Sequence, residues 1–258
     1  MASSPETPVL ELQGVGKRFS DGTLALDGID LDVRPGELVS VVGPSGCGKS
    51  TLLRIVAGLA GPTSGMVAVR TRRIGLVFQD PTLLPWRSVR ANVELLGELD
   101  GTSRAECQRL AGEAIAVVGL GELAGHPPQA LAGGMRMRAS LGKSRVLRPD
   151  LLLLDEPFGA LDELTRQRLN DELAQLLSER RFAALLVTHS VTESVFLSSR
   201  VAVLSARPGR VVETFQVPFP YPRAPLLRFS GAFSRLAGEV SECLRAGAER
   251  VDAAVEQG

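Results

Sequence analysis

Two short stretches of the chain carry residue types that could bind and cleave a nucleoside triphosphate. The first runs from Gly43 to Ser50 and matches the pattern G-x-x-x-x-G-K-[ST]. Glycines there let backbone N–H groups curl around phosphate oxygens, and the start of a helix adds partial positive charge. Lys49 is expected to reach the terminal phosphates and the Ser50 hydroxyl to hold Mg²⁺. The predicted nucleotide-binding residues are Gly43, Pro44, Ser45, Gly46, Cys47, Gly48, Lys49, Ser50 and Thr51.

The second stretch is an apolar run that ends in two carboxylates, Leu151-Leu-Leu-Leu-Asp155-Glu156-Pro157. Asp155, at the carboxyl end of a predicted strand, is well placed to support Mg²⁺. Glu156 is a candidate to orient or deprotonate an attacking water. Alone, such a run could equally be a strand ending in a solvated acidic turn. Beside a phosphate loop it predicts triphosphate hydrolysis.

Short apolar runs and helical spacing predict the elements that must position these residues. Two runs, Leu38–Val42 and Leu151–Leu154, are apolar throughout except for Ser40, which is typical of central parallel strands covered on both faces. Helical spacing from about 88 to 147 predicts a helical insertion in an α/β sheet. The predicted strands are Val9–Gln13, Leu38–Val42, Met66–Arg70, Ile74–Phe78, Leu151–Asp155, Ala183–Thr188, Val201–Leu204 and Val211–Phe215, and the other predicted helices are Thr51–Gly58, Glu163–Arg181 and about Leu226–Val255.

Composition narrows the class of protein. The 258 residues, 44% of them hydrophobic, suffice for one large α/β domain or two small ones. Twenty-nine basic residues balance twenty-nine acidic ones, so no nucleic-acid partner is expected. The three cysteines lack metal-like spacing, which fits a reduced compartment. Because no apolar stretch approaches the roughly 18 residues of a membrane span, work at a membrane would require other subunits.

The ordered motifs resemble those of the ATP-binding subunits of ABC transporters, over roughly Val9 to Arg223. The resemblance implies that Phe19 lies against adenine, that Gln79 touches Mg²⁺ and the attacking water, and that His189 contacts the γ-phosphate. It also makes Asp155 and Glu156 the Mg²⁺ aspartate and the catalytic glutamate. Taken singly, Phe19 could be a core ring and His189 a capping residue. Their joint order and spacing favour the functional interpretation.

The same resemblance implies that one chain is half of a head-to-tail nucleotide sandwich. The signature that faces the partner's ATP corresponds to Leu131, Ala132, Gly133, Gly134 and Met135. Asp162, in Gly159-Ala-Leu-Asp162, matches the loop that communicates across the dimer. The implied metal residues are Ser50, Gln79 and Asp155, and the implied cofactors are ATP and Mg²⁺.

The fold implied is a RecA-like P-loop NTPase core with an antiparallel β subdomain and a helical insertion. We expect an ABC ATP-binding domain over residues 8–223, with the insertion at about 88–147, and a C-terminal helical tail over 224–258. The implied partners are a second ATP-binding subunit, two membrane-spanning permease subunits and, indirectly, an extracytoplasmic substrate-binding protein. The implied location is peripheral, at the cytoplasmic face of the inner membrane.

A narrower resemblance follows Gln79, where Leu84-Pro85-Trp86 is similar to the nitrate/sulfonate/taurine branch of importers. It implies that ATP hydrolysis powers import of a small anion of that kind. It also implies that Trp86 lies near the groove that receives a coupling helix of the membrane subunit. The alternative is an ordinary buried tryptophan.

Departures from the family pattern keep a second function open. Ala132 replaces the signature serine, Met137 replaces a glutamine, and Arg145 stands at a normally apolar position. These changes leave nucleotide binding by this chain's own loop untouched but bear on hydrolysis at the partner's loop. The alternative is therefore an ATP-binding subunit with weak hydrolysis that regulates a more active partner. A soluble ABC ATPase of DNA repair or translation is disfavoured, since the chain has neither a second cassette nor a coiled-coil insertion.

Overall fold

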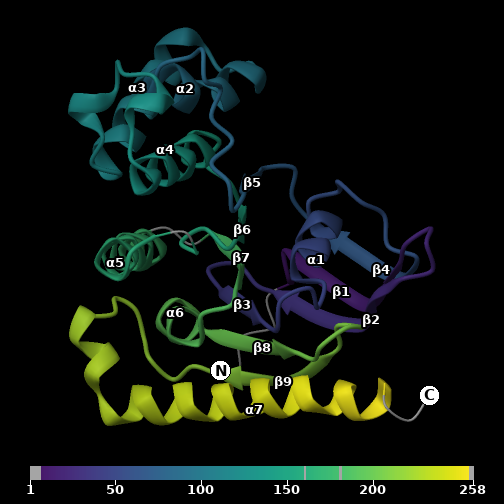
Figure 1. Cartoon of the computed structure of the whole chain (residues 1–258). Coiled ribbons are helices and arrows are strands. Elements are labelled where there is room, and N and C mark those ends of the chain that lie inside the picture. The colour runs from purple at the N-terminus through teal and green to yellow at the C-terminus, as the bar shows by residue number, and fades with distance from the viewer. Residues whose placement is uncertain (1–6, 160, 180–181, 256–258) are drawn as a thin grey trace, which may run out of the picture.

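The computed structural model of the chain describes residues 7–159, 161–179 and 182–255. These residues form two sheets flanked by helices, with a separate helical lobe above them (Figure 1). No helix in these ranges is both long enough and apolar enough to cross a membrane.

The larger sheet has six strands in the order β5-β6-β7-β3-β8-β9. All neighbours pair in parallel except β8 and β9. The strands are β3 (Leu38–Val42), β5 (Ile74–Val77), β6 (Leu151–Asp155), β7 (Ala183–Thr188), β8 (Arg200–Leu204) and β9 (Val211–Gln216). Every residue of β3, β6 and β7 is buried, which confirms the prediction of central parallel strands.

The smaller sheet is antiparallel, in the order β2-β1-β4, and consists of β1 (Leu10–Arg18), β2 (Leu24–Val33) and β4 (Ser64–Val69). The sequence pattern misses β2 and ends β1 at Gln13, and both predictions are wrong. Gly14 and Gly28 adopt positive φ angles of 57° and 64°, and the β1–β2 pairing shifts register three times. These bulges break the period-two alternation by which a strand is recognised.

The helical lobe consists of α2 (Val89–Leu99), α3 (Arg104–Val117) and α4 (Gly133–Val146), which pack around a core of their own. The remaining helices are α1 (Lys49–Val56), α5 (Glu163–Glu179), α6 (Val191–Leu197) and α7 (Gly231–Val255). The predicted end of α5 at Arg181 lies outside the described residues. The tail differs from one predicted helix, because a 3₁₀ turn over Pro225–Phe229 precedes α7 and Ser230 caps the latter, its Oγ accepting from the Phe233 N–H at 3.2 Å.

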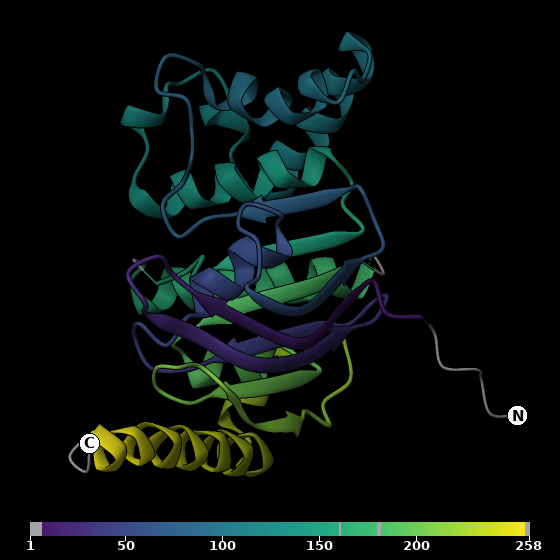
Figure 2. The ribbon, with the colours of Figure 1, turned by 90° about the vertical axis from the view of Figure 1, so that its right-hand side faces the viewer.

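Two apolar cores hold the large sheet between layers. On one face α1 and the small sheet pack against it, and on the other face α5, α6 and α7 do so (Figures 1 and 2). The parallel strands consequently end at one common edge. The phosphate loop after β3, the carboxylates after β6 and His189 after β7 all follow strands at that edge. This is where ligands bind in open α/β sheets.

Candidate functional site

The phosphate loop connects β3 directly to α1. Gly48, the residue before the helix, has φ 108°, and a Cβ atom there would lie 2.7 Å from Leu26 Cδ2 and 2.8 Å from the Ala25 carbonyl oxygen. Only glycine fits this position. The Lys49 ammonium donates to the carbonyl oxygens of Gly43 at 2.8 Å and Pro44 at 2.9 Å. The loop therefore closes around its own lysine, and its cation is held beside the start of α1.

Ser50 and Asp155 bring two oxygen ligands together from different elements. The Ser50 hydroxyl donates to Asp155 Oδ1 at 3.0 Å, and Asp155 is the last residue of β6. Burial raises the pKa of the Asp155 carboxyl group above its ordinary value. A hydroxyl and a buried carboxylate form a donor set that fits Mg²⁺, whose charge would offset the burial of the carboxylate. Gln79, two residues beyond β5, lines a cavity together with Ser50.

Glu156 follows Asp155 in a strained backbone conformation. Its φ is 44°, which is unusual for a residue other than glycine, and its N–H donates to the Val187 carbonyl oxygen at 2.8 Å. Its Oε2 lies 3.0 Å from Nδ1 of His189. The turn thus aims the carboxylate at the edge of the sheet and pairs it with the histidine.

Two hydrogen bonds of the Thr188 hydroxyl group fix the loop that carries His189. The Thr188 hydroxyl donates to Oε2 of Glu193 at 3.0 Å and accepts from the Ser190 N–H at 3.1 Å. Glu193 is buried, and burial raises its pKa to about 7. The Thr188 hydroxyl group therefore ties together the two residues that flank His189 and limits the freedom of its backbone.

A cavity of about 540 Å³ opens over these elements. Its walls are formed by Phe19, Asp21, Thr23, Ala25, Ser45, Gly46, Gly48, Lys49, Ser50, Thr51, Gln79, Glu156 and Arg207. Phe19 is 44% exposed, so it is not a core ring. Gly43, Pro44 and Cys47 do not line the cavity, and Cys47 is buried behind the loop.

Four residues of the cavity wall are absent from the sequence prediction, namely Asp21, Thr23, Ala25 and Arg207. Ala25 lies in β2, the strand that the sequence pattern misses, and Asp21 and Thr23 lie in the turn before it. Arg207 lies in a Pro-Gly turn between β8 and β9, and nothing in the local pattern signals its contact with the phosphate loop.

The predicted signature lies apart from this cavity. Leu131, Ala132, Gly133, Gly134 and Met135 are at the start of α4, and none of them lines the cavity. Ala132 occupies the N-cap of α4 without a side-chain hydrogen bond. Asp162 Oδ1 accepts from the Thr165 N–H at 3.0 Å and so caps α5. Met137 is buried against the large sheet.

Trp86 is 77% exposed, and the alternative of a buried core tryptophan is therefore wrong. The segment around it is held firmly. The Asn92 side chain accepts from the Leu84 N–H at 2.6 Å and donates to the carbonyl oxygens of Leu84 and Arg87. Gln129 donates to the Pro85 carbonyl oxygen at 3.0 Å. A well-ordered loop thus presents the indole ring to solvent.

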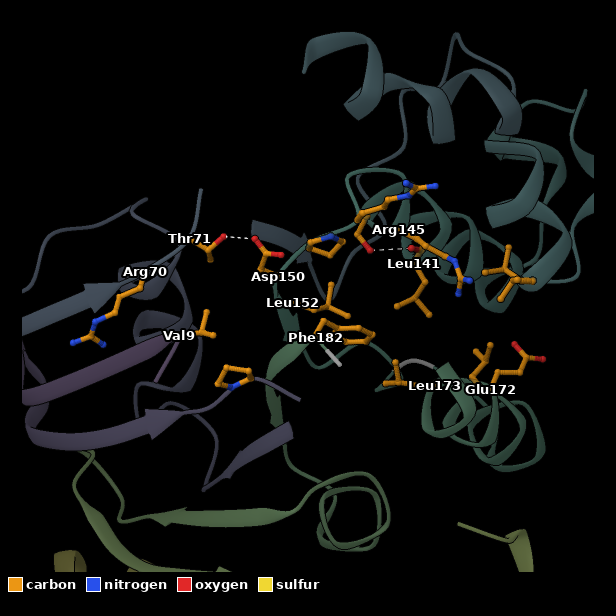
Figure 3. Close-up of a pocket in the computed structure, with 17 residues that line it drawn as sticks. Val9, Arg70, Thr71, Leu141, Arg145, Asp150, Leu152, Glu172, Leu173 and Phe182 are labelled. Carbon is orange, nitrogen blue, oxygen red and sulfur yellow. Dashed lines mark hydrogen bonds between the residues drawn. The ribbon is translucent and has the colours of Figure 1, made fainter. Parts of the chain in front are cut away.

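A second cavity, of about 470 Å³, lies between the start of β6 and helices α4 and α5 (Figure 3). Arg145, the departure noted in α4, lines it and is half-buried there. The walls include Leu141 and Leu173, and the Asp150 carboxylate accepts from the Thr71 hydroxyl at 2.7 Å. No residue predicted to bind nucleotide or metal lines this cavity. The predicted nucleotide-binding residues lie at the other cavity.

A glycine-rich loop between a buried parallel strand and a helix, beside a strand that ends in Asp-Glu, defines a P-loop nucleotide-binding protein. A family model described as "ABC transporter" matches residues 26–159. The chain belongs to the ABC transporter family, as an ATP-binding cassette.

Relatives with similar sequence agree with this. The chain is 43% identical over 237 residues to the aliphatic sulfonates import ATP-binding protein SsuB 1 of Mesorhizobium japonicum, covering 90% of this chain and 87% of that protein. It is 41% identical over 228 residues to the nitrate import ATP-binding protein NrtC of Synechococcus elongatus, covering 84% of this chain but 34% of that longer protein. Among solved structures, the dimeric bacterial ABC transporter cassette MJ0796 matches with a TM-score of 0.74 and 30% identity, over 82% of this chain and 100% of that one.

Proposed function

We propose that this chain is the ATP-binding and ATP-hydrolysing subunit that energises an ABC importer of a small anion such as nitrate, a sulfonate or taurine. The observation that carries the proposal is the convergence of Lys49, the Ser50–Asp155 pair and the Glu156–His189 pair on one sheet edge. The cargo class rests on the similarity to the sulfonate and nitrate import proteins. Substrate choice itself would reside in other subunits.

In the proposed mechanism, the chain first positions ATP. The Phe19 ring would stack on adenine, since this side chain is partly exposed on the cavity wall. The amides of the phosphate loop and the Lys49 ammonium would hold the phosphates. Ser50, Asp155 and Gln79 would hold Mg²⁺, which when bound supplies positive charge to the phosphate oxygens.

For hydrolysis, the Glu156 carboxylate would orient a water opposite the bond between the γ-phosphorus and the leaving oxygen of ADP. As the water oxygen bonds to phosphorus, that P–O bond breaks, and the water proton passes to Glu156. His189, 3.0 Å from Glu156 Oε2, would hold the carboxylate in place and contact the γ-phosphate. The strained turn at Glu156 serves this placement.

We also propose that the site is completed by a second ATP-binding subunit. The signature segment 131–135 and Asp162 lie outside the chain's own cavity, so they would act on the partner's nucleotide. The cassette proper would span residues 8–223, with the insertion at about 88–147 and a helical tail over 224–258. Two permease subunits, reached by an extracytoplasmic binding protein, would bind it at the cytoplasmic face of the inner membrane.

Replacing Trp86 with alanine tests the docking part of this proposal. Because the indole is exposed on a well-ordered loop, Trp86→Ala should leave the melting temperature and ATP affinity unchanged. It should weaken assembly with the permease subunits by about tenfold or more, as truncation of an aromatic interface anchor does. Co-purification from membranes that contain the whole transporter measures this. Normal assembly together with a large fall in melting temperature would show a structural role instead.

The alternative, a weakly hydrolysing regulatory subunit, is favoured by one specific observation: Ala132 caps α4 without any side-chain hydrogen bond. A serine there could donate to a γ-phosphate oxygen across the dimer, and such bonds to charged groups contribute about 1.5–3 kcal/mol. Single-turnover hydrolysis by the assembled transporter separates the two functions, because a regulatory subunit would bind ATP but cleave it only slowly.

Replacing Ala132 with serine should raise steady-state ATP turnover of the assembled transporter roughly tenfold. The serine should also restore the cap of α4 and add about 1 kcal/mol to the free energy of unfolding. The Gly133 and Gly134 amides remain in both proteins, which is why the wild-type site is weakened but present. Turnover that stays level or falls would mean that other contacts compensate for the alanine, and the regulatory alternative would lose its support.

A further inference from the structure

The turn between β8 and β9 carries an arginine that faces the nucleotide cavity. Arg207 Nε donates to the Gly46 carbonyl oxygen at 3.1 Å, and Arg207 lines the cavity with Phe19 and Asp21. Gly46 has φ 75°, and a Cβ atom there would lie 3.4 Å from an outer nitrogen of the Arg207 guanidinium group. A cation from a distant part of the chain therefore rests against the phosphate loop.

Backbone hydrogen bonds fix the turn that presents this arginine. Gly209 N–H donates to the Ala25 carbonyl oxygen at 2.9 Å, and the Asp27 N–H donates to the Gly209 carbonyl oxygen at 3.0 Å. A Cβ atom at Gly209 would lie 2.3 Å from the Cys47 carbonyl oxygen. The turn thus packs directly against β2 and the back of the phosphate loop. These contacts fix the backbone that carries Arg207, and the bond to Gly46 places its side chain.

The ionisable residues of the cavity wall include a second cation besides Lys49. Among the described residues that line the cavity, the ionisable groups are Asp21, Lys49, Glu156 and Arg207. Two carboxylates and two cations balance, whereas a nucleoside triphosphate adds several negative charges. The Lys49 ammonium is held at the Gly43 and Pro44 carbonyl groups. Arg207 supplies positive charge at Gly46, further along the loop.

We propose that Arg207 is a second phosphate-binding cation of this site, acting on the phosphates of ATP or ADP. The inference rests on the proposed function for nucleotide binding but not for hydrolysis. A guanidinium group offers several N–H donors in a fixed plane, so one can hold the Gly46 carbonyl oxygen while others face phosphate oxygens. The same residue then orders the loop and binds the ligand.

Nucleotide titration of the purified full-length chain tests this, with a matched control in the same turn. Arg210 makes an ion pair with Asp27, its Nε lying 2.9 Å from Oδ2, and does not line the cavity. Arg207→Gln should weaken ATP, ADP and pyrophosphate binding about tenfold and flatten the salt dependence of affinity. Arg207→Lys should restore part of the affinity, and Arg210→Gln should bind as the wild type does. Thermal melting confirms that each variant is folded.

Three results would overturn the inference. The first is wild-type affinity in Arg207→Gln. The second is an equal loss in Arg207→Gln and Arg210→Gln, which would assign the effect to the shape of the turn. The third is a loss seen with adenosine but not with pyrophosphate, which would place the guanidinium at the nucleoside. A wild-type chain that binds no nucleotide would overturn the proposed function as well, whereas one that binds but does not hydrolyse ATP leaves Arg207 in its role.

Discussion

Glu156→Gln is expected to abolish nearly all ATP hydrolysis by the assembled transporter while ATP still binds. The amide has the shape of the carboxylate but cannot accept the proton of the attacking water. Loss of a general base costs about 10²–10⁴-fold in rate. Nucleotide affinity should change little, because in the proposed function Lys49 and the loop amides, not Glu156, would hold the phosphates. Measuring phosphate release and ATP binding on the same preparation separates the two effects.

The positive φ of Glu156 decides the choice of control. Any substitution at a left-handed position risks altering the turn, but glutamine keeps the same side-chain length and the same backbone preference. His189→Asn provides the companion variant, since it removes the partner of Glu156 Oε2 and keeps the carboxylate. Phosphate release at the wild-type rate in Glu156→Gln would remove this residue from the chemistry. A comparable loss in both variants would support the paired arrangement.

The sequence could predict those parts of the molecule whose cause is local. The strands Leu38–Val42 and Leu151–Leu154 are apolar except for Ser40 because both faces are covered, and that pattern is visible within four or five residues. The phosphate loop is equally local, since the loop conformation and the helix start lie within one segment. The Ser50–Asp155 contact followed from placing two motifs at the ends of parallel strands.

Features set by bulges or by topology could not be predicted in this way. The strand Leu24–Val33 bends at Gly28, and the alternation of apolar residues is lost there. Arg207 meets Gly46 only because β8 pairs with β3 and the turn after β8 folds back over β2. No pattern within the turn reports that contact. The exposure of Trp86 could not be predicted either, because a single aromatic residue in an irregular segment has no periodicity that would assign it to a buried or an exposed face.

The charged residues of the nucleotide cavity are held by different elements, and this decides which variants affect binding or hydrolysis alone. Arg207, Lys49 and Glu156 line one cavity but are held by different elements, namely a β-turn, the start of a helix and a strand end. The Glu156 side chain bonds to His189, so changing it leaves the hydrogen bonds of Lys49 and Arg207 to the phosphate loop in place. Binding and hydrolysis can therefore be assigned separately. The phosphate loop is the one element on which both depend.

Lys49→Ala is expected to remove most nucleotide binding, and with it all dependent activity. Lys49 is almost fully buried, and its ammonium group donates two hydrogen bonds within the loop, to the carbonyl oxygens of Gly43 and Pro44. In the wild type, the ammonium group would form charge-assisted hydrogen bonds with the phosphates when ATP binds. The alanine variant lacks them, and the loss of two such bonds should cost about 3 kcal/mol or more of binding free energy. That corresponds to roughly 10²-fold or more in the dissociation constant of ATP, measured by equilibrium titration.

The Lys49 variant also separates charge from loop structure. In Lys49→Ala the two carbonyl oxygens lose their donor, and the loop itself could shift. Lys49→Arg keeps a cation and hydrogen-bond donors, yet we expect its larger guanidinium group to fit poorly, because Lys49 is only 5% exposed and its ammonium group is held by two carbonyl groups. Weak ATP binding by both variants, with wild-type melting temperatures, would show that a compact ammonium group at this position binds the phosphates. Full affinity in Lys49→Ala would mean that the loop amides and Arg207 suffice, and the assignment of Lys49 as the principal phosphate-binding residue would be wrong.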